Sequence, residues 1–196
     1  MALLPFPTKM TFFLFFLFFY DTNLLVYYMK LTFSKKLISV SLAKIEDAKL
    51  LLKIHNASIS GGFFKSKNLI IYKDHIEWLK KKLKSNSKIY IGKNSSKKKF
   101  GYVRFDEVKN NIFEVSLGNL ANFYGKGLGS SMLEKSIKKF KKNYKPKKII
   151  SAVKKFNTRS VKCFLKNDFV KVKFDKKKHY TINKLNTKKE YYLEFK

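Results

Sequence analysis

Three glycines stand within five residues in the stretch NFYGKGLGSSML, residues 122–133, immediately before an amphipathic run. The whole chain has only eight glycines, so this concentration indicates a backbone with special requirements. A glycine-rich turn that opens a helix exposes backbone N–H groups without intrahelical partners. These donors and the helix dipole favour a phosphate group. The sequence therefore predicts an anion-binding turn that leads into a helix containing residues 133–144.

Two common phosphate-binding loops do not fit this stretch. A P-loop needs Gly-Lys followed by Ser or Thr, whereas Lys126 precedes Gly127 here. A dinucleotide-binding turn needs a third glycine three places after the second, and Met132 stands at that place. The turn must therefore belong to another class of phosphate site, or it serves only the chain reversal.

The turn resembles the pyrophosphate loop of the GCN5-related N-acetyltransferases (GNAT). The pattern of that family is Arg or Gln, two residues, Gly, one residue, and then Gly or Ala; residues 124–129, YGKGLG, match it after the first place. Tyr124 replaces the usual Arg or Gln, which removes a side-chain contact but keeps the backbone donors. Upstream, residues 113–117 (FEVSL) resemble the fourth strand of the family.

A second resemblance follows downstream, in residues 150–169. A strand, an Asn, a Ser three places on and two aromatic residues match the later GNAT motif, with Asn157, Ser160, Phe164 and Phe169 in those places. Asp168 stands where the family usually has glycine. The resemblance covers approximately residues 37–195.

The order of the expected elements agrees with this family. Alternating apolar residues predict strands, and apolar residues at helical spacing predict helices. Strands are expected over residues 36–42, 88–92, 100–105, 112–117, 148–153, 169–174 and 191–195, helices over 43–56 and 158–167, and two further helices that contain residues 74–83 and 133–144. The spacing of Asp74 and Glu77 predicts a capping box at the start of the second helix. We expect an α+β, GNAT-like three-layer αβα domain over residues 37–196, with a central mixed, mostly antiparallel sheet of six to seven strands.

The resemblance implies an acyltransferase that moves an acetyl group directly from acetyl-CoA to a primary amine. Glu114 is the candidate catalytic base; its structural alternative is a carboxylate that faces solvent or pairs with a lysine. Amides near Leu117 and Gly118 are expected to polarise the thioester carbonyl. Asn157 is expected to bond the pantetheine arm or, alternatively, to cap a helix.

The cofactor contacts implied by the resemblance come from the fourth strand, the glycine turn and the later motif: Leu117, Gly118, Tyr124, Gly125, Lys126, Gly127, Leu128, Gly129, Ser130, Asn157 and Phe164. Many members carry a tyrosine at the place of Phe164, where it protonates the leaving thiolate. Phe164 has no proton to give, so the general acid is not identified. The adjacent Cys163 is expected to pack in the helix rather than to form an acetyl-cysteine.

The acceptor amine is suggested by the early helices, which recognise it in this family. The helix that carries His75 and Trp78 resembles the branch that acetylates nucleotide-linked amino sugars, as in the pseudaminic acid pathway. A ribosomal-protein-type N-terminal acetyltransferase is the alternative within the class. The structural alternative is that His75 faces solvent and Trp78 belongs to the core.

The charge of the chain leaves a different class of function open. Lys and Arg number 44 against 13 Asp and Glu, a formal net charge of +31, so a basic nucleic-acid-binding module without catalysis is the alternative. Only Arg104 and Arg159 are arginines, however, and dedicated nucleic-acid readers depend on arginine. We therefore expect a small-molecule substrate and no specific nucleic acid. The lysine surplus fits the composition that an AT-rich genome gives any surface.

The chain has one cysteine and three histidines, and their spacing fits no metal site. A single cysteine also suits a reducing cytoplasm, which is the expected location. Residues 1–28 form a hydrophobic extension with a polar break at residues 21–23. They are interpreted as an over-extended gene start, a membrane anchor over residues 11–28 or a surface-lying tail, with Met1, Met10 and Met29 as candidate starts.

Overall fold

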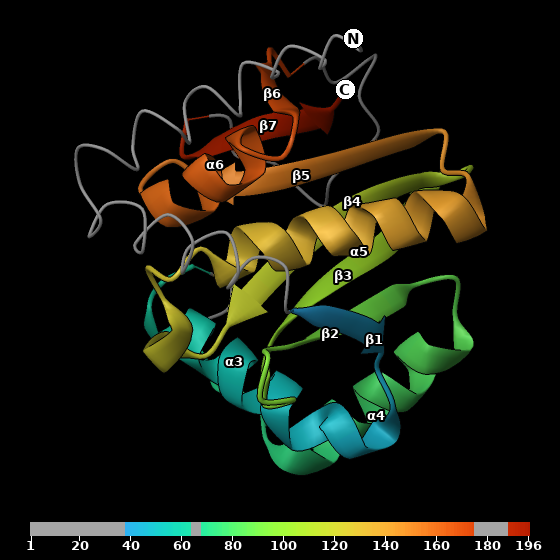
Figure 1. Cartoon of the computed structure of the whole chain (residues 1–196), viewed down its shortest axis with the longest axis vertical. Coiled ribbons are helices and arrows are strands. Elements are labelled where there is room, and N and C mark those ends of the chain that lie inside the picture. Colours follow the sequence, from blue (N-terminus) through green and yellow to red (C-terminus); the bar gives the residue numbers. More distant parts are fainter. Residues whose placement is uncertain (1–37, 64–67, 175–187) are drawn as a thin grey trace, which may run out of the picture. The chain divides into compact units, whose positions relative to one another are not determined.

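A seven-stranded mixed sheet organises the part of the chain that the computed structural model describes, residues 38–63, 68–174 and 188–196 (Figure 1). Residues 1–28, and with them the expected anchor and start sites, lie outside the described residues. The elements are β1 (Ser39–Leu42), η1 (Ile45–Asp47), α3 (Ala48–Ser60), α4 (Tyr72–Lys84), β2 (Lys88–Lys93), β3 (Lys99–Lys109), β4 (Ile112–Asn119), η2 (Ala121–Phe123), α5 (Leu128–Tyr144), β5 (Lys148–Lys154), α6 (Thr158–Leu165), β6 (Phe169–Val172) and β7 (Glu190–Phe195).

The strands lie in the order β1-β2-β3-β4-β5-β7-β6. Every neighbouring pair is antiparallel except β4 and β5, which run parallel. The crossover between these two strands is α5, as a parallel connection requires. The expected element order, the mixed sheet and the α+β class are confirmed.

Helices cover both faces of the sheet and produce three layers. On one face, α5 and α6 pack on apolar side chains from β2 to β7. On the other face, α3 and α4 cover β2 and β3, where Ile89 and Ile91 point towards them. Tyr90 lies between these two isoleucines in sequence and points to the opposite face, because side chains alternate along a strand.

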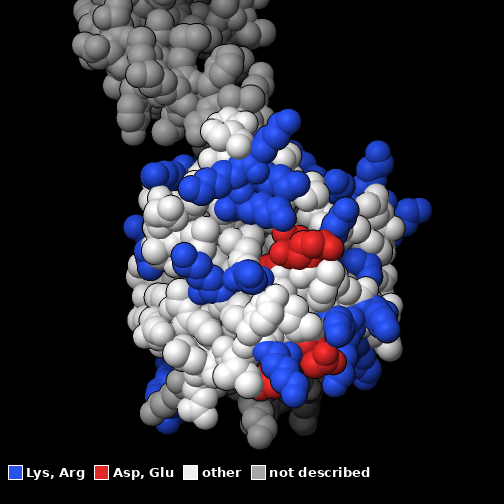
Figure 2. Space-filling view, turned by 90° about the horizontal axis from the view of Figure 1, so that it is seen from below, with Lys and Arg blue, Asp and Glu red and all other residues white. Residues whose placement is uncertain are grey.

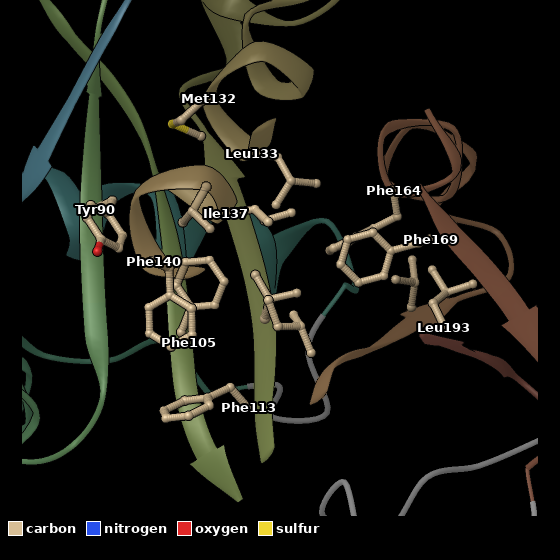
Figure 3. Close-up of a cluster of buried hydrophobic side chains, with 14 of the residues drawn as sticks. Tyr90, Phe105, Phe113, Met132, Leu133, Ile137, Phe140, Phe164, Phe169 and Leu193 are labelled. Atoms are coloured by element: carbon tan, nitrogen blue, oxygen red, sulfur yellow. The ribbon is translucent and has the colours of Figure 1, made fainter. Parts of the chain in front are cut away.

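The largest apolar cluster lies beneath α5. The rings of Phe105 in β3 and Phe140 in α5 are stacked with centroids 4.1 Å apart and an interplanar angle of 4°, and Phe113 meets Phe140 edge to face (Figure 3). Met132, Leu133 and other α5 residues continue this contact towards the start of the helix. The packing fixes α5, and therefore the glycine turn that precedes it, against the middle of the sheet.

The start of α4 differs from the prediction. The helix begins at Tyr72 after an N-cap at Ile71, whose side chain makes no cap hydrogen bond, so the capping box of Asp74 and Glu77 is wrong. The Asn56 side chain accepts from the Ile70 amide at 3.0 Å and donates to the Ile70 carbonyl at 2.9 Å. This contact fixes the chain just ahead of the helix and lets it begin earlier, which leaves Asp74 in the first turn, where the helix dipole favours an acid.

None of the helices within the described ranges is both long enough and apolar enough to cross a bilayer.

Candidate functional site

Strands β4 and β5 separate halfway along their length. Their parallel pairing consists of Ile112 with Lys148, Phe113 with Ile149 and Glu114 with Ile150. Beyond this point β4 remains paired with β3 as far as Asn119, and β5 remains paired with β7 as far as Lys154. The sheet therefore contains a gap between the second halves of its two central strands.

Backbone groups of β4 line this gap. The Val115 carbonyl is directed at β5, because it accepts a hydrogen bond from the Ser151 hydroxyl at 2.9 Å. The Leu120 amide is directed at β3, because it donates to the Phe100 carbonyl at 2.9 Å. Since backbone groups alternate along a strand, the N–H of Leu117 faces the gap, beyond the last residue that pairs with β5.

The Gly118 amide does not point into the gap, where a donor to the thioester carbonyl is expected. It pairs with Tyr102 of β3, and the same alternation directs its amide at β3. A Cβ atom at this position would lie 2.6 Å from Cγ2 of Ile54 in α3. Gly118 therefore allows α3 to approach the sheet, and Leu117 is the better candidate donor.

The glycine turn has the open backbone that the sequence predicts. Gly125 and Gly127 have φ angles of +75° and +71°, which side chains disfavour, and a Cβ atom on either would meet nothing within 4 Å. Within the described part of the chain, the amides of residues 125–130 donate to no protein acceptor, while the next amide, that of Ser131, donates to the Gly127 carbonyl at 3.3 Å. The turn thus presents a run of free donors beside open space.

The third glycine of the turn has a packing role. A Cβ atom on Gly129 would lie 2.7 Å from Nδ2 of Asn119, the last residue of β4. The absence of that atom lets the first turn of α5 sit directly against the end of β4. The gap between the strands and the donors of the turn are consequently neighbours.

Side chains around the turn carry positive charge. Tyr124 is 36% exposed, and the Arg159 guanidinium lies over its ring with Cζ 4.1 Å from the centroid. The ammonium of Lys126 lies 5.7 Å from the centroid of the Phe123 ring. Leu128 is buried in the core, whereas Ser130 accepts a hydrogen bond from Asn167 at 2.9 Å.

Helix α6 forms the other border of the site. The Asn157 side chain caps it by accepting from the Ser160 amide at 3.2 Å, which is the structural alternative given for this residue. Phe164 is only 2% exposed and packs edge to face on Phe169, so it contributes to the core and offers no surface for the expected cofactor contact. Burial raises the pKa of the Cys163 thiol to about 11 against the opposing effect of Lys166, so this thiol is protonated and a poor nucleophile at neutral pH.

Glu114 is the last β4 residue that pairs with β5, so it lies where the gap begins. It is half-buried, and its cross-strand partner is Asp106 of β3. The charge of Glu114 also affects Tyr192 of β7. Burial raises the pKa of this tyrosine, Glu194 raises it further, and Glu114 adds to the increase. The side chains of Phe113 and Val115 belong to the apolar cluster beneath α5, and side chains alternate along a strand, so Glu114 lies on the opposite face of the sheet.

His75 and Trp78 do meet in one pocket, beneath α3 and α4. The rings are stacked with centroids 5.2 Å apart, and His55 of α3 meets both edge to face. The pocket is also lined by Leu51, Ile89, Tyr102 and Arg104 and has about 10 Å³ of space, room for approximately one water molecule. A sugar requires far more space. His75 is only 1% exposed, so the structural alternative in which it faces solvent is wrong as well.

The histidines of this pocket are neutral at physiological pH. Burial lowers the pKa of His55 to about 4, with further lowering by Arg104 and His75. Burial also lowers the pKa of His75, although a hydrogen bond with the Ala48 backbone opposes this. Its Nε2 is buried and without a hydrogen-bond partner among the described residues. The surroundings of the pocket therefore disfavour the protonated form of both histidines.

Arg104 is held by two neighbours. Its Nε lies 2.6 Å from Oδ2 of Asp106, although the N–H is not aligned for a hydrogen bond, and its Cζ lies 5.4 Å from the centroid of the Trp78 ring. Burial alone would raise the pKa of Asp106, but Arg104 and Lys82, whose Nζ is 2.7 Å from Oδ1, lower it. The carboxylate therefore stays charged and neutralises this arginine.

Sequence reasoning missed several of these residues. His55, Tyr102 and Ser151 carried no motif, because each is defined by its neighbours in space. Arg104 and Arg159 were marked only as the two arginines of a lysine-rich chain. No group of three or more His, Cys, Asp and Glu side chains that could hold a metal ion occurs in the described ranges.

The surface of the chain is strongly basic. On the face shown in Figure 2, Lys and Arg side chains form several groups with uncharged surface between them, and few carboxylates interrupt them. In the sequence, Glu134 is the only acidic residue between Val115 and Asn167. Its carboxylate pairs with Lys138 one turn later in α5, at 2.8 Å. The region of the gap and the turn therefore favours anions.

Comparisons with known proteins agree with this geometry. The sequence model of the acetyltransferase (GNAT) family matches residues 57–169, which is more than half of the chain. No curated protein matches it. Among solved structures, yncA of Salmonella typhimurium, solved with its cofactor acetyl-CoA, has a TM-score of 0.67 and 12% identity, over 81% of this chain and 93% of that one.

Two further solved structures have the same fold. The spermidine N-acetyltransferase of Vibrio cholerae, in complex with CoA and spermine, has a TM-score of 0.66 and 14% identity, over 81% of this chain and 94% of that one. The ribosomal-protein-alanine N-acetyltransferase of Brucella melitensis has a TM-score of 0.65 and 15% identity, over 80% and 97%. At these identities the likeness establishes the fold, and the acceptors in these names differ from one another.

Proposed function

The chain belongs to the GNAT family of acetyltransferases, and from this premise we propose how it binds acetyl-CoA and which amine it acetylates. As a member of this family it is an N-acetyltransferase that takes the acetyl group from acetyl-CoA. In our proposal the amides of residues 125–130 bind the diphosphate of CoA, and the gap between β4 and β5 receives the pantetheine arm.

One observation carries this proposal: residues 125–130 present a run of amides that donate to no acceptor in the described part of the chain. Residues 125–127 are exposed and residues 128–130 are buried or half-buried. The first amides of a helix have no intrahelical partner, and together with the helix dipole such free donors suit an anion. The open space beside Gly125 and Gly127 leaves room for phosphate oxygens. The residues present therefore fit a diphosphate.

The reacting groups are assigned to β4. Acetyl-CoA supplies the thioester when bound, and the Leu117 amide, which faces the gap, is the proposed donor to its carbonyl oxygen. Glu114 is the proposed general base, which removes a proton from the acceptor ammonium directly or through a water molecule. It lies on the face opposite α5, so the amine is expected to approach from the side of α3.

We propose an anionic molecule with a primary amine as acceptor, and a nucleotide-linked amino sugar is the first candidate. The support is electrostatic: the net charge of +31 attracts a diphosphate-bearing acceptor and repels a polyamine. The pocket of His75 and Trp78, at about 10 Å³, gives no support to a sugar site there. The amino-sugar proposal therefore depends on charge alone, and an N-terminal peptide remains its competitor.

The test of cofactor binding uses a matched pair at Gly127. Asn and Asp both tolerate positive φ and differ only in charge, so Gly127→Asn and Gly127→Asp separate electrostatics from backbone strain. In calorimetric titration the wild type is expected to bind acetyl-CoA saturably, and the Asp variant at least about tenfold more weakly than the Asn variant. Equal affinities for the two variants, or no binding by the folded wild type, would reject the proposed site.

The test of the acceptor follows thiol release with a panel of amines. UDP-linked amino sugars, peptides with free N-termini, and spermidine are compared at equal concentration and at two salt concentrations. The anionic acceptors are expected to have the highest kcat/KM, and added salt is expected to reduce this advantage. A preference for spermidine, or for neutral peptides at both salt concentrations, would reject an anionic acceptor.

A further inference from the structure

The guanidinium of Arg159 stacks on Tyr124, the residue that immediately precedes the open turn, with Cζ 4.1 Å from the ring centroid. Stacking on an aromatic face leaves the N–H groups at the edge of the guanidinium available to a ligand. We propose that Arg159 is the side chain that binds the diphosphate of CoA, with Tyr124 as its support. This inference rests on the function proposed above.

Helix α6, which carries Arg159, is held at both ends by hydrogen bonds. The Asn157 side chain caps α6 through the Ser160 amide at 3.2 Å, which places Arg159 in the first turn of that helix. At the other end of α6, Asn167 donates to the Ser130 hydroxyl at 2.9 Å and to the Cys163 carbonyl at 2.7 Å. Helix α6 is therefore linked directly to the first turn of α5, where the free amides lie.

The electrostatic surroundings of this arginine favour an anionic ligand. A cation in the first turn of a helix lies in the unfavourable field of the helix dipole, and no carboxylate in the described ranges forms an ion pair with Arg159. Arg104, the other arginine, has Asp106 at 2.6 Å. A diphosphate bound at residues 125–130 would supply the negative charge that Arg159 lacks, and a guanidinium fork suits phosphate oxygens.

The experiment is calorimetric titration of the full chain with CoA. Arg159→Gln is expected to weaken binding about tenfold, the scale of one exposed charge-assisted hydrogen bond. Lys166→Gln, at the other end of α6, removes the same unit charge and controls for the general positive field, so it is expected to change affinity less than about twofold. Urea unfolding of each variant checks that the fold is retained, and Arg159→Lys, which keeps the charge without the fork, is expected to give an intermediate affinity.

Two related ligands identify the phosphate that is bound. Dephospho-CoA lacks the ribose 3′-phosphate and keeps the diphosphate, so Arg159→Gln is expected to weaken its binding as much as that of CoA. A loss seen with CoA but not with dephospho-CoA would overturn the diphosphate assignment. 4′-Phosphopantetheine lacks the diphosphate, and its affinity is expected to respond less to the substitution.

The role of Tyr124 is tested by coupling. Tyr124→Leu alone is expected to weaken CoA binding. Added to Arg159→Gln it is expected to have little further effect, because the Tyr124 ring matters only when the guanidinium is present. Tyr124→Phe, which keeps the ring, is expected to recover most of that loss. Additive effects would reject the support role. Normal CoA binding by the wild type with unchanged affinity in Arg159→Gln rejects this inference alone, whereas no binding by the wild type rejects the proposed function as well.

Discussion

The hydroxyl of Ser151 donates a hydrogen bond of 2.9 Å to the carbonyl of Val115, just past the point where β4 and β5 stop pairing. Val115 is the first β4 residue after the last paired one, Glu114. A side chain thus satisfies a backbone carbonyl that would otherwise lose its partner at the opening of the gap. The hydrogen bond from Ser151 therefore stabilises the point at which the two strands separate, and a substitution of Ser151 can remove it.

Ser151→Ala is expected to lower the free energy of unfolding by about 1–3 kcal/mol, because it leaves the buried Val115 carbonyl without a partner. Ser136→Ala is the matched control: this serine of α5 is fully buried, and its hydroxyl has no hydrogen-bond partner in the described ranges. That variant is expected to be neutral or slightly stabilising. Urea unfolding measures both, and equal losses would contradict a specific role for the Ser151 hydroxyl.

The pocket histidines predict a pH dependence of stability. Burial and the charges of Arg104 and His75 lower the pKa of His55 to about 4 in the folded state. In the unfolded chain the pKa of this histidine is near its ordinary value of about 6.5. As the pH falls from about 6.5 to 4, the unfolded state takes up a proton that the folded state refuses, so stability is lost in this window. His55→Gln is expected to flatten the loss in urea unfolding between pH 7 and 4, and identical slopes would contradict the assignment.

The proposed role of Glu114 as general base predicts a specific kinetic result. Glu114→Gln is expected to lower kcat by about 10²–10⁴ and to remove the acidic limb of the pH–rate profile, with little change in acetyl-CoA affinity. Glu134→Gln removes an exposed carboxylate of α5 that pairs with Lys138 at 2.8 Å, and it is expected to leave both parameters unchanged. An unaltered pH profile in Glu114→Gln would show that another group removes the proton.

The aromatic cluster predicts a large stability difference between two phenylalanines. Phe140 is fully buried and stacks on Phe105 with centroids 4.1 Å apart (Figure 3), so Phe140→Ala is expected to cost about 3–5 kcal/mol. Phe156 is 60% exposed, and Phe156→Ala is expected to cost less than about 1 kcal/mol. Denaturant midpoints compare the two, and similar losses would contradict the assignment of Phe140 to the main core.

Much of the fold could be predicted from local patterns. Ile89, Tyr90 and Ile91 alternate between faces as strand residues must, and Leu133, Ile137 and Phe140 follow the spacing of a helical face that is indeed buried. The glycine turn was also readable, because positive φ angles at Gly125 and Gly127 are a local requirement. The boundaries were less accurate where a distant residue intervened, as Asn56 does at the start of α4.

The site was only partly predictable. Phe164 occupies the motif place that suggested a cofactor contact, yet it is 2% exposed. Gly118 was expected to offer an amide to the reaction, but the strand alternation directs that amide at β3. Both differences arise because a motif gives the order of residues along the chain and not the direction in which each one points.

The sequence by itself determined the periodicities, the open turn and the order of the elements, because each depends on residues within a few places of one another. Only the tertiary structure decided that Ser151 supports the gap at Val115, that His55 and Arg104 share a pocket with His75, and that Arg159 stacks on Tyr124. These contacts join elements that are remote in sequence, and they form only when the strands assemble into the sheet and the two helical layers pack on it. Packing therefore decides which of the predicted residues meet.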